Sequence, residues 1–180
     1  MMMTSTMSAR LKLVDEHVAF ENEHDLDRIM ETFGESARYD DEPWGAHYQG
    51  CDEVRAFYAD LLRALPDLHI DIKRRHVTED AVVLEVIIRG RHLGSWRGLP
   101  PTGCPVESPL CGIFTFDETN RLAGEKIYYD RATVLPQLGI FDAPESLRGR
   151  ITAAVTHPLT MARIVGRRIL GRLLPQRPPS

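Results

Sequence analysis

The chain lacks several features that would have assigned it quickly to a class. Its three cysteines, Cys51, Cys104 and Cys111, do not have metal-ligand spacing, and an odd number argues against a disulfide framework. No apolar run approaches the roughly 20 residues that span a bilayer. Residues 1–9 lack the long apolar core of a signal peptide. We therefore expect a reduced, soluble, cytoplasmic protein.

Motifs for phosphate and metal binding are also missing. The glycines between Gly90 and Gly103 lack the strand–loop–helix context and the lysine of a phosphate-binding loop. No pair of histidines has the spacing of a metal site. These absences lead us to expect no cofactor and no metal.

Acidic residues are missing from the last part of the chain. Every aspartate and glutamate lies at or before Glu145, whereas residues 148–180 hold seven arginines. The preceding residues then hold fifteen cationic side chains against all 26 acidic ones, a balance of −11. Because so acidic a body is a poor nucleic-acid surface, we expect no nucleic-acid partner. The arginines predict a contact with a protein partner or an anionic membrane, or they cover the acidic surface of the body.

The length and composition suit one folded core. A chain of 180 residues with 43% hydrophobic content has little room for two. We expect a disordered N-terminus over residues 1–10, one pocket domain over 11–142, and a basic helical tail over 143–180. Within the tail, a helix is expected around Met161–Leu174, and residues 175–180 are expected to be disordered.

The first part of the domain has helical periodicity. Residues 11–33 carry two apolar stripes separated by the polar stretch 21–25, and Asp25 suits a helix N-cap, so we predict two helices with a break. From Val54 to Leu65 apolar residues recur at helical spacing until Pro66, which predicts a third helix.

After Pro66 the apolar period changes to two. Alternation predicts strands over about 68–73, 82–92, 106–116 and 122–133, with a short extra strand near 38–40. Three helices followed by four long strands indicate an α+β fold, in which a curved antiparallel sheet wraps around the N-terminal helices. Such a cone leaves a cavity for a hydrophobic small molecule at its open end.

Three stretches resemble a known family. They are Gly50-(x)3-Val54-(x)2-Phe57-Tyr58, then Gly90-Arg-His92-Leu-Gly94 followed by Gly98-Leu-Pro-Pro-Thr-Gly103, and Tyr128-Tyr129-Asp130 with Gln137-Leu138-Gly139. In this order they resemble the SnoaL-like polyketide cyclases, within the nuclear transport factor 2-like superfamily that also holds the ketosteroid isomerases. The resemblance covers residues 12–141. It implies the cone-shaped fold and a range of reactions, so the fold does not settle the function.

Asp130 is the first candidate catalytic residue. It resembles the cyclase aspartate that acts as general acid and base, a role that needs a carboxylate shielded from water. Asp130 and Tyr128 share strand parity with Leu122, which favours an inward face unless a bulge reverses it. The alternative is an ion pair of Asp130 with Arg131 or Arg97 at the rim of the sheet.

Asp41 is the second candidate. It falls where the ketosteroid isomerases keep their proton-transferring base, although Asp-Asp-Glu-Pro is also a common turn sequence. The comparison with these isomerases fails elsewhere. Gly112 replaces the acid that would stabilise an enolate, His17 replaces the partnering tyrosine, and Tyr58 matches a supporting tyrosine. A ketosteroid isomerase is therefore not expected, because its oxyanion donors are lost.

His92 is the third candidate. It ends the aliphatic row of the second predicted strand, so it should point toward the cavity mouth, where it could donate to a substrate carbonyl or serve as a structural histidine. Aromatic residues could line the pocket or fill the core. Trp96, in a glycine-rich loop, could instead form a lid or an oligomer contact. The candidate substrate-binding residues are His17, Trp44, Tyr58, Trp96, Phe114 and Tyr128.

Two functions follow. The first is a cofactor-independent lyase, isomerase or cyclase that applies carboxylate acid–base chemistry to a hydrophobic carbonyl compound. The second is a non-catalytic pocket protein or dimeric scaffold, whose arginine-rich tail contacts a partner or a membrane. An exposed aromatic-bearing sheet makes a homodimer the expected oligomer.

Overall fold

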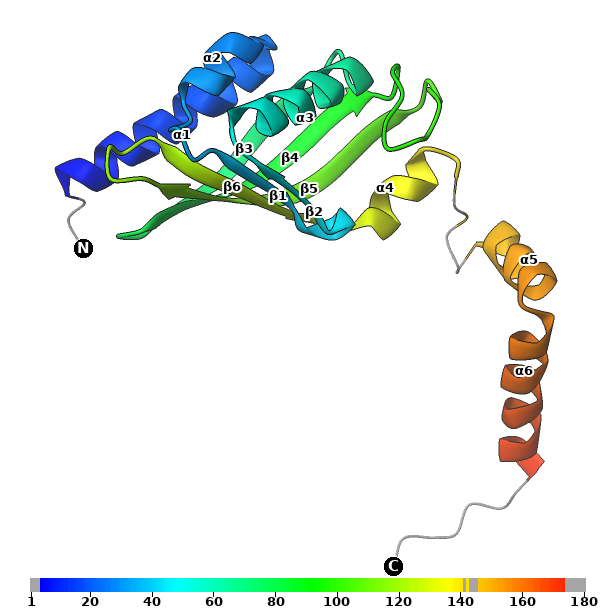
Figure 1. Ribbon diagram of the computed structural model, residues 1–180. Coiled ribbons are helices and arrows are strands. Elements are labelled where there is room, and N and C mark those ends of the chain that lie inside the picture. Colours follow the sequence, from blue (N-terminus) through cyan, green and yellow to red (C-terminus); the bar gives the residue numbers. More distant parts are fainter. Residues whose placement is uncertain (1–3, 141, 143–145, 174–180) are drawn as a thin grey trace, which may run out of the picture. The chain divides into compact units, whose positions relative to one another are not determined.

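The computed structural model describes residues 4–140, 142 and 146–173. The chain divides into two units, residues 1–139 and 140–180. The first unit carries a six-stranded sheet with helices on one face (Figure 1). This is the predicted α+β cone.

The first unit begins with two helices that share a polar break. Helix α1 (Ser5–Glu23) starts at Thr4, whose side chain accepts a hydrogen bond from the Met7 N–H, so the prediction of disorder over residues 1–10 is wrong from residue 4 onward. Helix α2 (Leu26–Glu31) starts at Asp25, which accepts from the Arg28 N–H as predicted. Between them His24 adopts a left-handed conformation with φ 57°. The two predicted helices are therefore confirmed, with an earlier start.

Helix α3 (Cys51–Ala64) positions the loop that follows the fourth strand. It ends two residues before Pro66, as predicted. The N–H groups of Leu93 and Gly94 donate to the Ala64 carbonyl at 2.9 and 3.2 Å. A Cβ on Gly94 would lie 2.2 Å from the Arg63 carbonyl oxygen, so only glycine permits this approach. The loop over residues 92–104 is thereby fastened to the end of α3.

The sheet has the strand order β2-β1-β6-β5-β4-β3. Its strands are β1 (Arg38–Asp41), β2 (Ala46–Gln49), β3 (His69–Val77), β4 (Ala81–Arg91), β5 (Pro105–Phe116) and β6 (Leu122–Tyr129). All neighbours are antiparallel except β1 and β6, which run parallel. The four long strands and the short strand near 38–40 are confirmed, whereas β2 and the 3-10 helix η1 (Glu42–Trp44) were not predicted.

One extra residue in β6 changes which side chains face inward. Thr115 pairs with Gly124 but Phe116 pairs with Leu122, so Ala123 is a bulge. Before the bulge the inward-facing residue is even-numbered Leu122, and after it the inward-facing residues are odd-numbered. Ile127 is accordingly buried, whereas Tyr128 is exposed. The strand also ends at Tyr129, because Asp130 caps helix α4 (Arg131–Gln137). The prediction of a strand through residue 133 is wrong.

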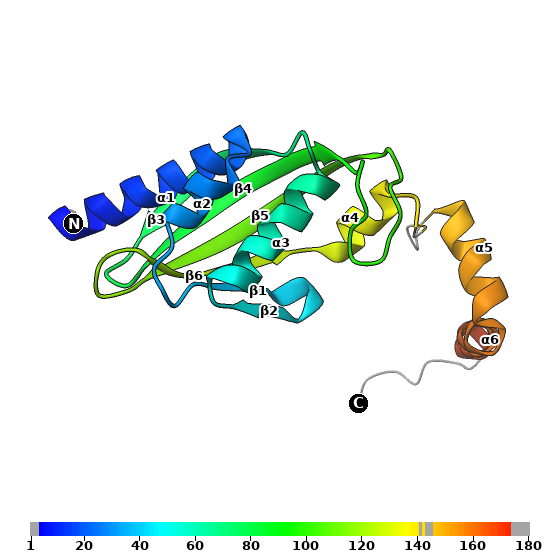
Figure 2. The same ribbon diagram turned by 45° about the horizontal axis from the view of Figure 1, so that its top comes forward.

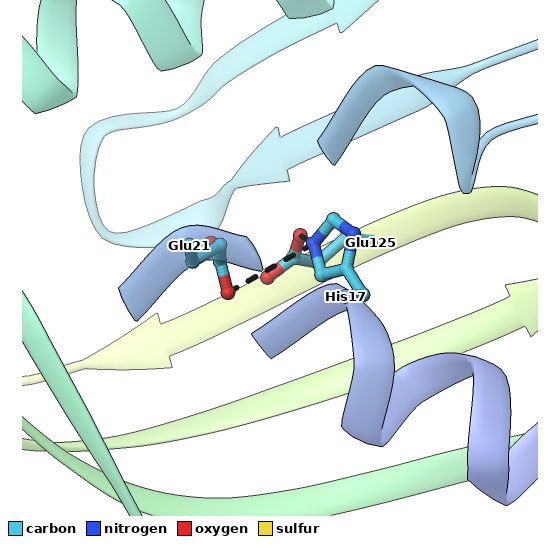
Figure 3. Close-up of side chains that lie close together, drawn as sticks. All are labelled: His17, Glu21 and Glu125. Atoms are coloured by element: carbon cyan, nitrogen blue, oxygen red, sulfur yellow. Dashed lines mark ion pairs between the residues drawn. The ribbon is translucent and has the colours of Figure 1, made fainter. Parts of the chain in front are cut away.

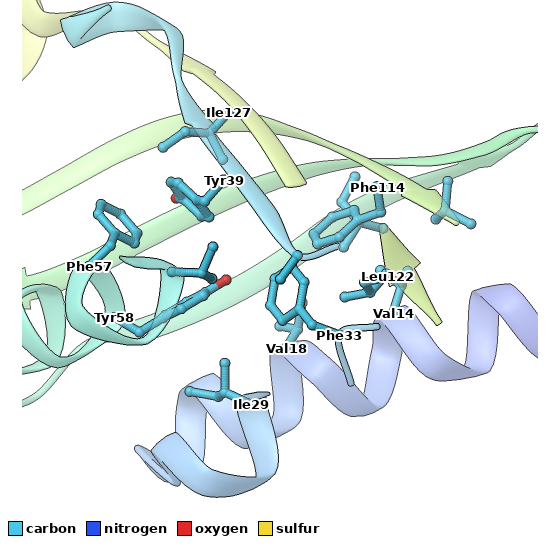
Figure 4. Close-up of a cluster of buried hydrophobic side chains, with 14 of the residues drawn as sticks. Val14, Val18, Ile29, Phe33, Tyr39, Phe57, Tyr58, Phe114, Leu122 and Ile127 are labelled. Carbon is cyan, nitrogen blue, oxygen red and sulfur yellow. The ribbon is translucent and has the colours of Figure 1, made fainter. Parts of the chain in front are cut away.

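The core lies between the helices and the sheet (Figure 4). One row of paired residues, Tyr39, Glu125, Phe114 and Val82, crosses four strands and is buried throughout. Helix α3 covers it with Phe57 and Tyr58, and helix α1 with Val14 and Val18 (Figures 2 and 4). A glutamate within this apolar row needs polar partners, because burial of an unpaired charge is costly.

The second unit contains helices α5 (Leu147–Thr156) and α6 (Pro158–Leu173). The sequence predicted a helix around 161–174 and placed the domain boundary at residue 142. The predicted disorder of residues 175–180 lies outside the described residues. Within the described ranges, no helix combines the length and apolarity of a membrane span.

Candidate functional site

A cavity opens between helices α1, α3 and α4 and the sheet. The volume in which the centre of a water-sized sphere can move is about 120 Å³, several times what one water needs. Its wall is largely apolar and includes Phe57, Leu84, Trp96, Leu110, Phe114 and Ile127. The polar side chains that line it are Glu21, Tyr39, Asp41, His92, Glu125 and Tyr129.

Asp41 is a nearly inaccessible carboxylate on this wall. Its exposed fraction is 1%, and its Oδ2 accepts an ion-paired hydrogen bond from Arg97. Among the described residues, Asp41 Oδ1 has no hydrogen-bond partner. Burial raises the pKa of Asp41, and the nearby Arg97 guanidinium and the Trp44 backbone N–H offset this shift only in part. Asp41 therefore combines an anion-stabilising cation with an oxygen that is free to take a proton.

A strained turn brings Arg97 to Asp41. Trp96 and Leu99 exchange backbone hydrogen bonds of 3.0 and 2.8 Å, which closes a two-residue turn. Its central residues have φ 48° at Arg97 and 79° at Gly98, the left-handed pair that such tight turns require. A positive φ is unfavourable for arginine, and the backbone hydrogen bonds of the turn and the ion pair with Asp41 both involve this segment.

Tyr129 and Trp44 lie beside Asp41. Trp44 Nε1 donates to the Tyr129 hydroxyl at 2.6 Å, and the guanidinium of Arg97 lies 5.0 Å from the centre of the Trp44 ring. Burial and the charge of Asp41 raise the pKa of Tyr129. The Tyr129 hydroxyl therefore stays protonated and can donate to a bound oxygen.

His92 is a cavity-lining residue whose ring carries one unpartnered nitrogen among the described residues. The Thr102 N–H donates to His92 Nδ1 at 3.3 Å, and the Thr102 hydroxyl lies 3.2 Å from the same nitrogen. Because Nδ1 accepts, the proton of the neutral ring is on Nε2. Burial lowers the pKa of His92, which favours this neutral form. Nε2 is buried and has no partner within the described part of the chain.

A third polar group lies at the wall formed by α1 and β6 (Figure 3). His17 Nε2 is 3.9 Å from Glu21 Oε2 and 3.4 Å from Glu125 Oε2. These three side chains could supply ligand atoms to a metal, and so could a second group formed by buried Asp40, half-buried Glu42 and exposed His47. In the buried group, however, His17 already bonds through both nitrogens, to Thr32 and Tyr58, so we interpret it as a hydrogen-bonded network.

Comparison with known proteins assigns the fold and the family. The family model for the SnoaL-like polyketide cyclases matches residues 12–138. The chain belongs to the SnoaL-like polyketide cyclase family. A comparison with curated proteins gives no match.

Several solved structures share the fold of this chain. AclR from Streptomyces galilaeus is 24% identical with a TM-score of 0.66, over 76% of this chain and 99% of its own. SalBIII, an epoxide hydrolase/cyclase-like enzyme in salinomycin pyran ring formation, is 18% identical with a TM-score of 0.61, over 71% and 95%. A protein with a ketosteroid isomerase-like fold from Catenulispora acidiphila is 19% identical with a TM-score of 0.60, over 74% and 96%.

Two of the residues predicted for the SnoaL-like site point elsewhere. Asp130 is exposed and caps helix α4, accepting from the Ala132 N–H at 2.8 Å and from the Thr133 hydroxyl at 3.1 Å. Tyr128 is 45% exposed. The expectation that both face inward is wrong, because the Ala123 bulge reverses the parity of the strand. The geometry therefore gives no support to Asp130 as a proton shuttle.

The other predicted residues lie in or around the cavity. Asp41, His92, Trp96 and Phe114 line it. His17 and Tyr58 are fully buried behind Glu21 and Glu125, in the polar network, and Trp44 holds Tyr129 from outside the wall. Trp96 packs edge-on against Phe57, with ring centres 5.8 Å apart.

Sequence reasoning missed Glu21, Arg97 as the partner of Asp41, Glu125 and Tyr129. Glu21 had a readable signal, because Val14, His17, Val18 and Glu21 follow helical spacing, which places two polar residues in an apolar stripe. Glu125 and Tyr129 had no such signal in the sequence, because the direction in which their side chains point depends on the Ala123 bulge.

Proposed function

We propose that the protein transfers protons at a carbon next to a carbonyl group in a hydrophobic small molecule, as a cyclase or isomerase with Asp41 as the base. The observation that carries this proposal is Asp41, which lines the apolar cavity and whose buried Oδ1 has no partner among the described residues. Family membership supports the reaction class.

The chemistry follows from the two oxygens of Asp41. Arg97 holds Oδ2 in place and favours the ionised form of the carboxylate, while Oδ1 takes the proton from the carbon. The electron pair of the broken C–H bond moves to the carbonyl oxygen and forms an enolate. The enolate carbon then either regains the proton at another position or attacks a second carbonyl to close a ring. His92 Nε2–H and the Tyr129 hydroxyl are the donors that we expect to bind ketone oxygens on this substrate.

Deuterium uptake tests this proposal without knowledge of the natural substrate. In heavy water, the protein should accelerate exchange of the hydrogens next to the carbonyl in cyclic ketones such as α-tetralone, followed by proton NMR. Asp41→Asn keeps an acceptor for Arg97 but removes the base, so the exchange rate should fall by about 100-fold or more.

Asp130→Asn is the matched control. Asparagine caps helices as well as aspartate does, so this variant should fold and exchange at the wild-type rate. If the wild-type protein and Asp41→Asn exchange deuterium into every cyclic ketone tested at the same rate, the proposed function is contradicted. If Asp130→Asn loses exchange and Asp41→Asn does not, the catalytic base is Asp130.

We propose a second role, peripheral binding to anionic membranes, for helices α5 and α6. Residues 147–164 expose large apolar side chains together with arginines, and the sequence has no carboxylate after Glu145. The exposed apolar residues are Leu147, Ile151, Val155, Leu159 and Ile164. Such a composition favours the interface of a negatively charged bilayer.

Vesicle sedimentation tests the membrane role. The protein should bind vesicles with phosphatidylserine and not vesicles of phosphatidylcholine alone, and each arginine replaced by glutamine should cost about 1 kcal/mol of binding. The residues to replace are Arg148, Arg150, Arg163 and Arg167; four exposed arginines of the first unit, Arg55, Arg63, Arg74 and Arg91, are the control set. Equal loss in both sets, or no binding, contradicts this role.

A further inference from the structure

The buried network beside the cavity contains two carboxyl groups, Glu21 and Glu125, that have no role in the proposed function. Glu21 and Glu125 are each 5% exposed, and both line the cavity. Figure 3 shows the two carboxyl groups close to the imidazole of His17. Two carboxylates in one apolar wall would repel each other, so their protons must be located first.

Hydrogen bonds fix the protons of His17. The Thr32 hydroxyl donates to the Ile29 carbonyl at 2.6 Å, so Thr32 Oγ1 accepts from His17 Nδ1–H at 2.7 Å. His17 Nε2 therefore faces the Tyr58 hydroxyl, 3.0 Å away, and Tyr58 also makes a very short hydrogen bond to Glu125.

Two proton arrangements satisfy both hydrogen bonds of the row His17–Tyr58–Glu125, and the row has no net charge in either of them. Either Nε2–H donates to Tyr58 and Tyr58 donates to ionised Glu125, or protonated Glu125 donates to Tyr58 and Tyr58 donates to Nε2. Both arrangements contain the same number of protons and differ only by shifts along the two hydrogen bonds. The row thus has no net positive charge to offset a charge on Glu21.

These surroundings favour the neutral form of Glu21, although a hydrogen bond from Tyr58 opposes the shift in part. The titratable groups facing it are His17 on its own helix, Tyr58 on α3, Tyr39 on β1 and Glu125 on β6. Burial, and then the charge of Glu125, raise the pKa of Glu21 well above that of an ordinary glutamate. A carboxylic acid in this state offers an O–H donor to the cavity.

The acid and the base lie on the same side of the sheet. Asp41 pairs with Ile127 and Tyr39 pairs with Glu125, so Asp41 is two residues along the neighbouring strand from the Glu125 position. Gly112 occupies the same cross-strand row as Ile127, and both line the cavity. The charge of Arg97 opposes the effect of burial on the pKa of Asp41, whereas the charge of Glu125 adds to the effect of burial on the pKa of Glu21. The two neighbours therefore push the pKa values of the two carboxyl groups apart, as acid–base catalysis needs.

We propose that Glu21 is a second catalytic residue, a neutral acid that hydrogen-bonds and protonates the substrate oxygen on which charge develops, and that the His17–Tyr58–Glu125 row holds it in place. This inference rests on the proposed function and deepens it. The substrate would be an apolar ketone whose oxygen reaches the wall between α1 and β6.

The protons balance in this scheme. As Asp41 takes a proton from carbon, the electron pair reaches the carbonyl oxygen, which takes the proton of Glu21 and gives an enol. In an isomerisation the O–H proton returns to Glu21 when the carbonyl forms again, and Asp41 gives its proton to the new carbon. In a ring closure the enol O–H proton returns to Glu21 as the first carbonyl forms again, and Asp41 gives its proton to the oxygen of the attacked carbonyl, which becomes the new hydroxyl.

The test compares Glu21→Leu with Glu21→Gln. Leucine removes the donor, so kcat for exchange of α-tetralone should fall by about 100- to 1,000-fold, whereas glutamine keeps an N–H donor and should recover most of the loss. In parallel, isotope-edited NMR of carboxyl-labelled glutamate in the wild-type protein should show a signal from Glu21 that stays protonated at neutral pH. That signal should disappear in Glu21→Gln and persist in Glu125→Gln.

The outcomes separate the two proposals. Wild-type exchange in Glu21→Leu, or a Glu21 signal that titrates near the ordinary pH of about 4.3, overturns the acid role while leaving Asp41 as the base. If the wild-type protein shows no exchange, the proposed function fails. The role of Glu21 as a hydrogen-bond donor is then tested by comparing the dissociation constants of fluorenone, which has a ketone oxygen, and fluorene, which has none. Fluorenone should then bind about tenfold tighter to wild type, and this preference should be lost in Glu21→Leu. Equal affinities in wild type would overturn it.

Discussion

Replacement of Arg97 by leucine should destabilise the protein by about 3–5 kcal/mol at alkaline pH, because Asp41 is left as a buried carboxylate without its cation. The side chains are 17% and 1% exposed, so solvent can replace little of the lost interaction. The size of the loss should depend on pH, since Asp41 can escape the penalty by taking a proton.

The sign of this pH dependence follows from the direction of the shift. The pKa of Asp41 is already raised by burial in the wild-type protein, and loss of the Arg97 charge raises it further. A carboxyl group whose pKa is higher in the folded than in the unfolded state loses stability as pH rises between the two values. Arg97→Leu should therefore be closest to wild type in acid and fall away through neutral pH.

Urea unfolding over a pH series measures the effect. Arg97→Leu/Asp41→Asn should regain most of the stability, because the uncompensated charge is gone. Arg63→Leu is the matched control, since it breaks an exposed pair with Asp60 on α3 and should cost about 1 kcal/mol or less at any pH. A loss in Arg97→Leu that is independent of pH and not recovered in the double variant would show that Arg97 acts through packing alone.

Glu21→Gln should become more stable relative to wild type as pH rises. Above the unfolded value of about 4.3, the unfolded chain releases its proton while buried Glu21 keeps its own, so wild type loses about 1.4 kcal/mol per pH unit from this group. Glutamine cannot titrate and escapes this loss. The difference stops growing once the pH exceeds the raised pKa of Glu21.

Thermal and urea unfolding of the two proteins across the same pH series provide the measurement. Glu16→Gln is the control, because Glu16 lies on the same helix, is exposed and pairs with Lys12. Its stability relative to wild type should change little with pH. A Glu21→Gln difference that is equally flat would mean that Glu21 is ionised in the folded protein.

The sequence predicted the layers of this fold better than its site. Helix boundaries could be read because Asp25 and Pro66 are local signals, and strands because valine and isoleucine alternate. Asp41 and His92 were found as candidates, one by its resemblance and one by strand parity. Glu21 was passed over as part of a polar break, although its spacing from Val14 and Val18 placed it inward.

The prediction that Asp130 faces the cavity was wrong for a different reason. The parity of β6 was counted forward from Leu122, and nothing in the composition of the strand marks Ala123 as the extra residue. The contact between Arg97 and Asp41 joins residues 56 positions apart, and it depends on the left-handed turn at 97–98. Long-range pairings of this kind are set by the assembled sheet, and a single sequence does not contain them. The homodimer stays a prediction.

The Ala123 bulge also has a consequence for the ancestry of such sites. Loss of that single codon would exchange the lining and outer residues of β6 together, withdrawing Glu125, Ile127 and Tyr129 and turning Tyr128 inward. A one-residue deletion could thus rewrite the chemistry of the pocket while every other residue stays the same. When relatives are aligned across β6, positions should be numbered backward from Asp130. Numbering forward from Leu122 crosses the bulge, and residues of the same parity before and after it lie on opposite faces of the sheet.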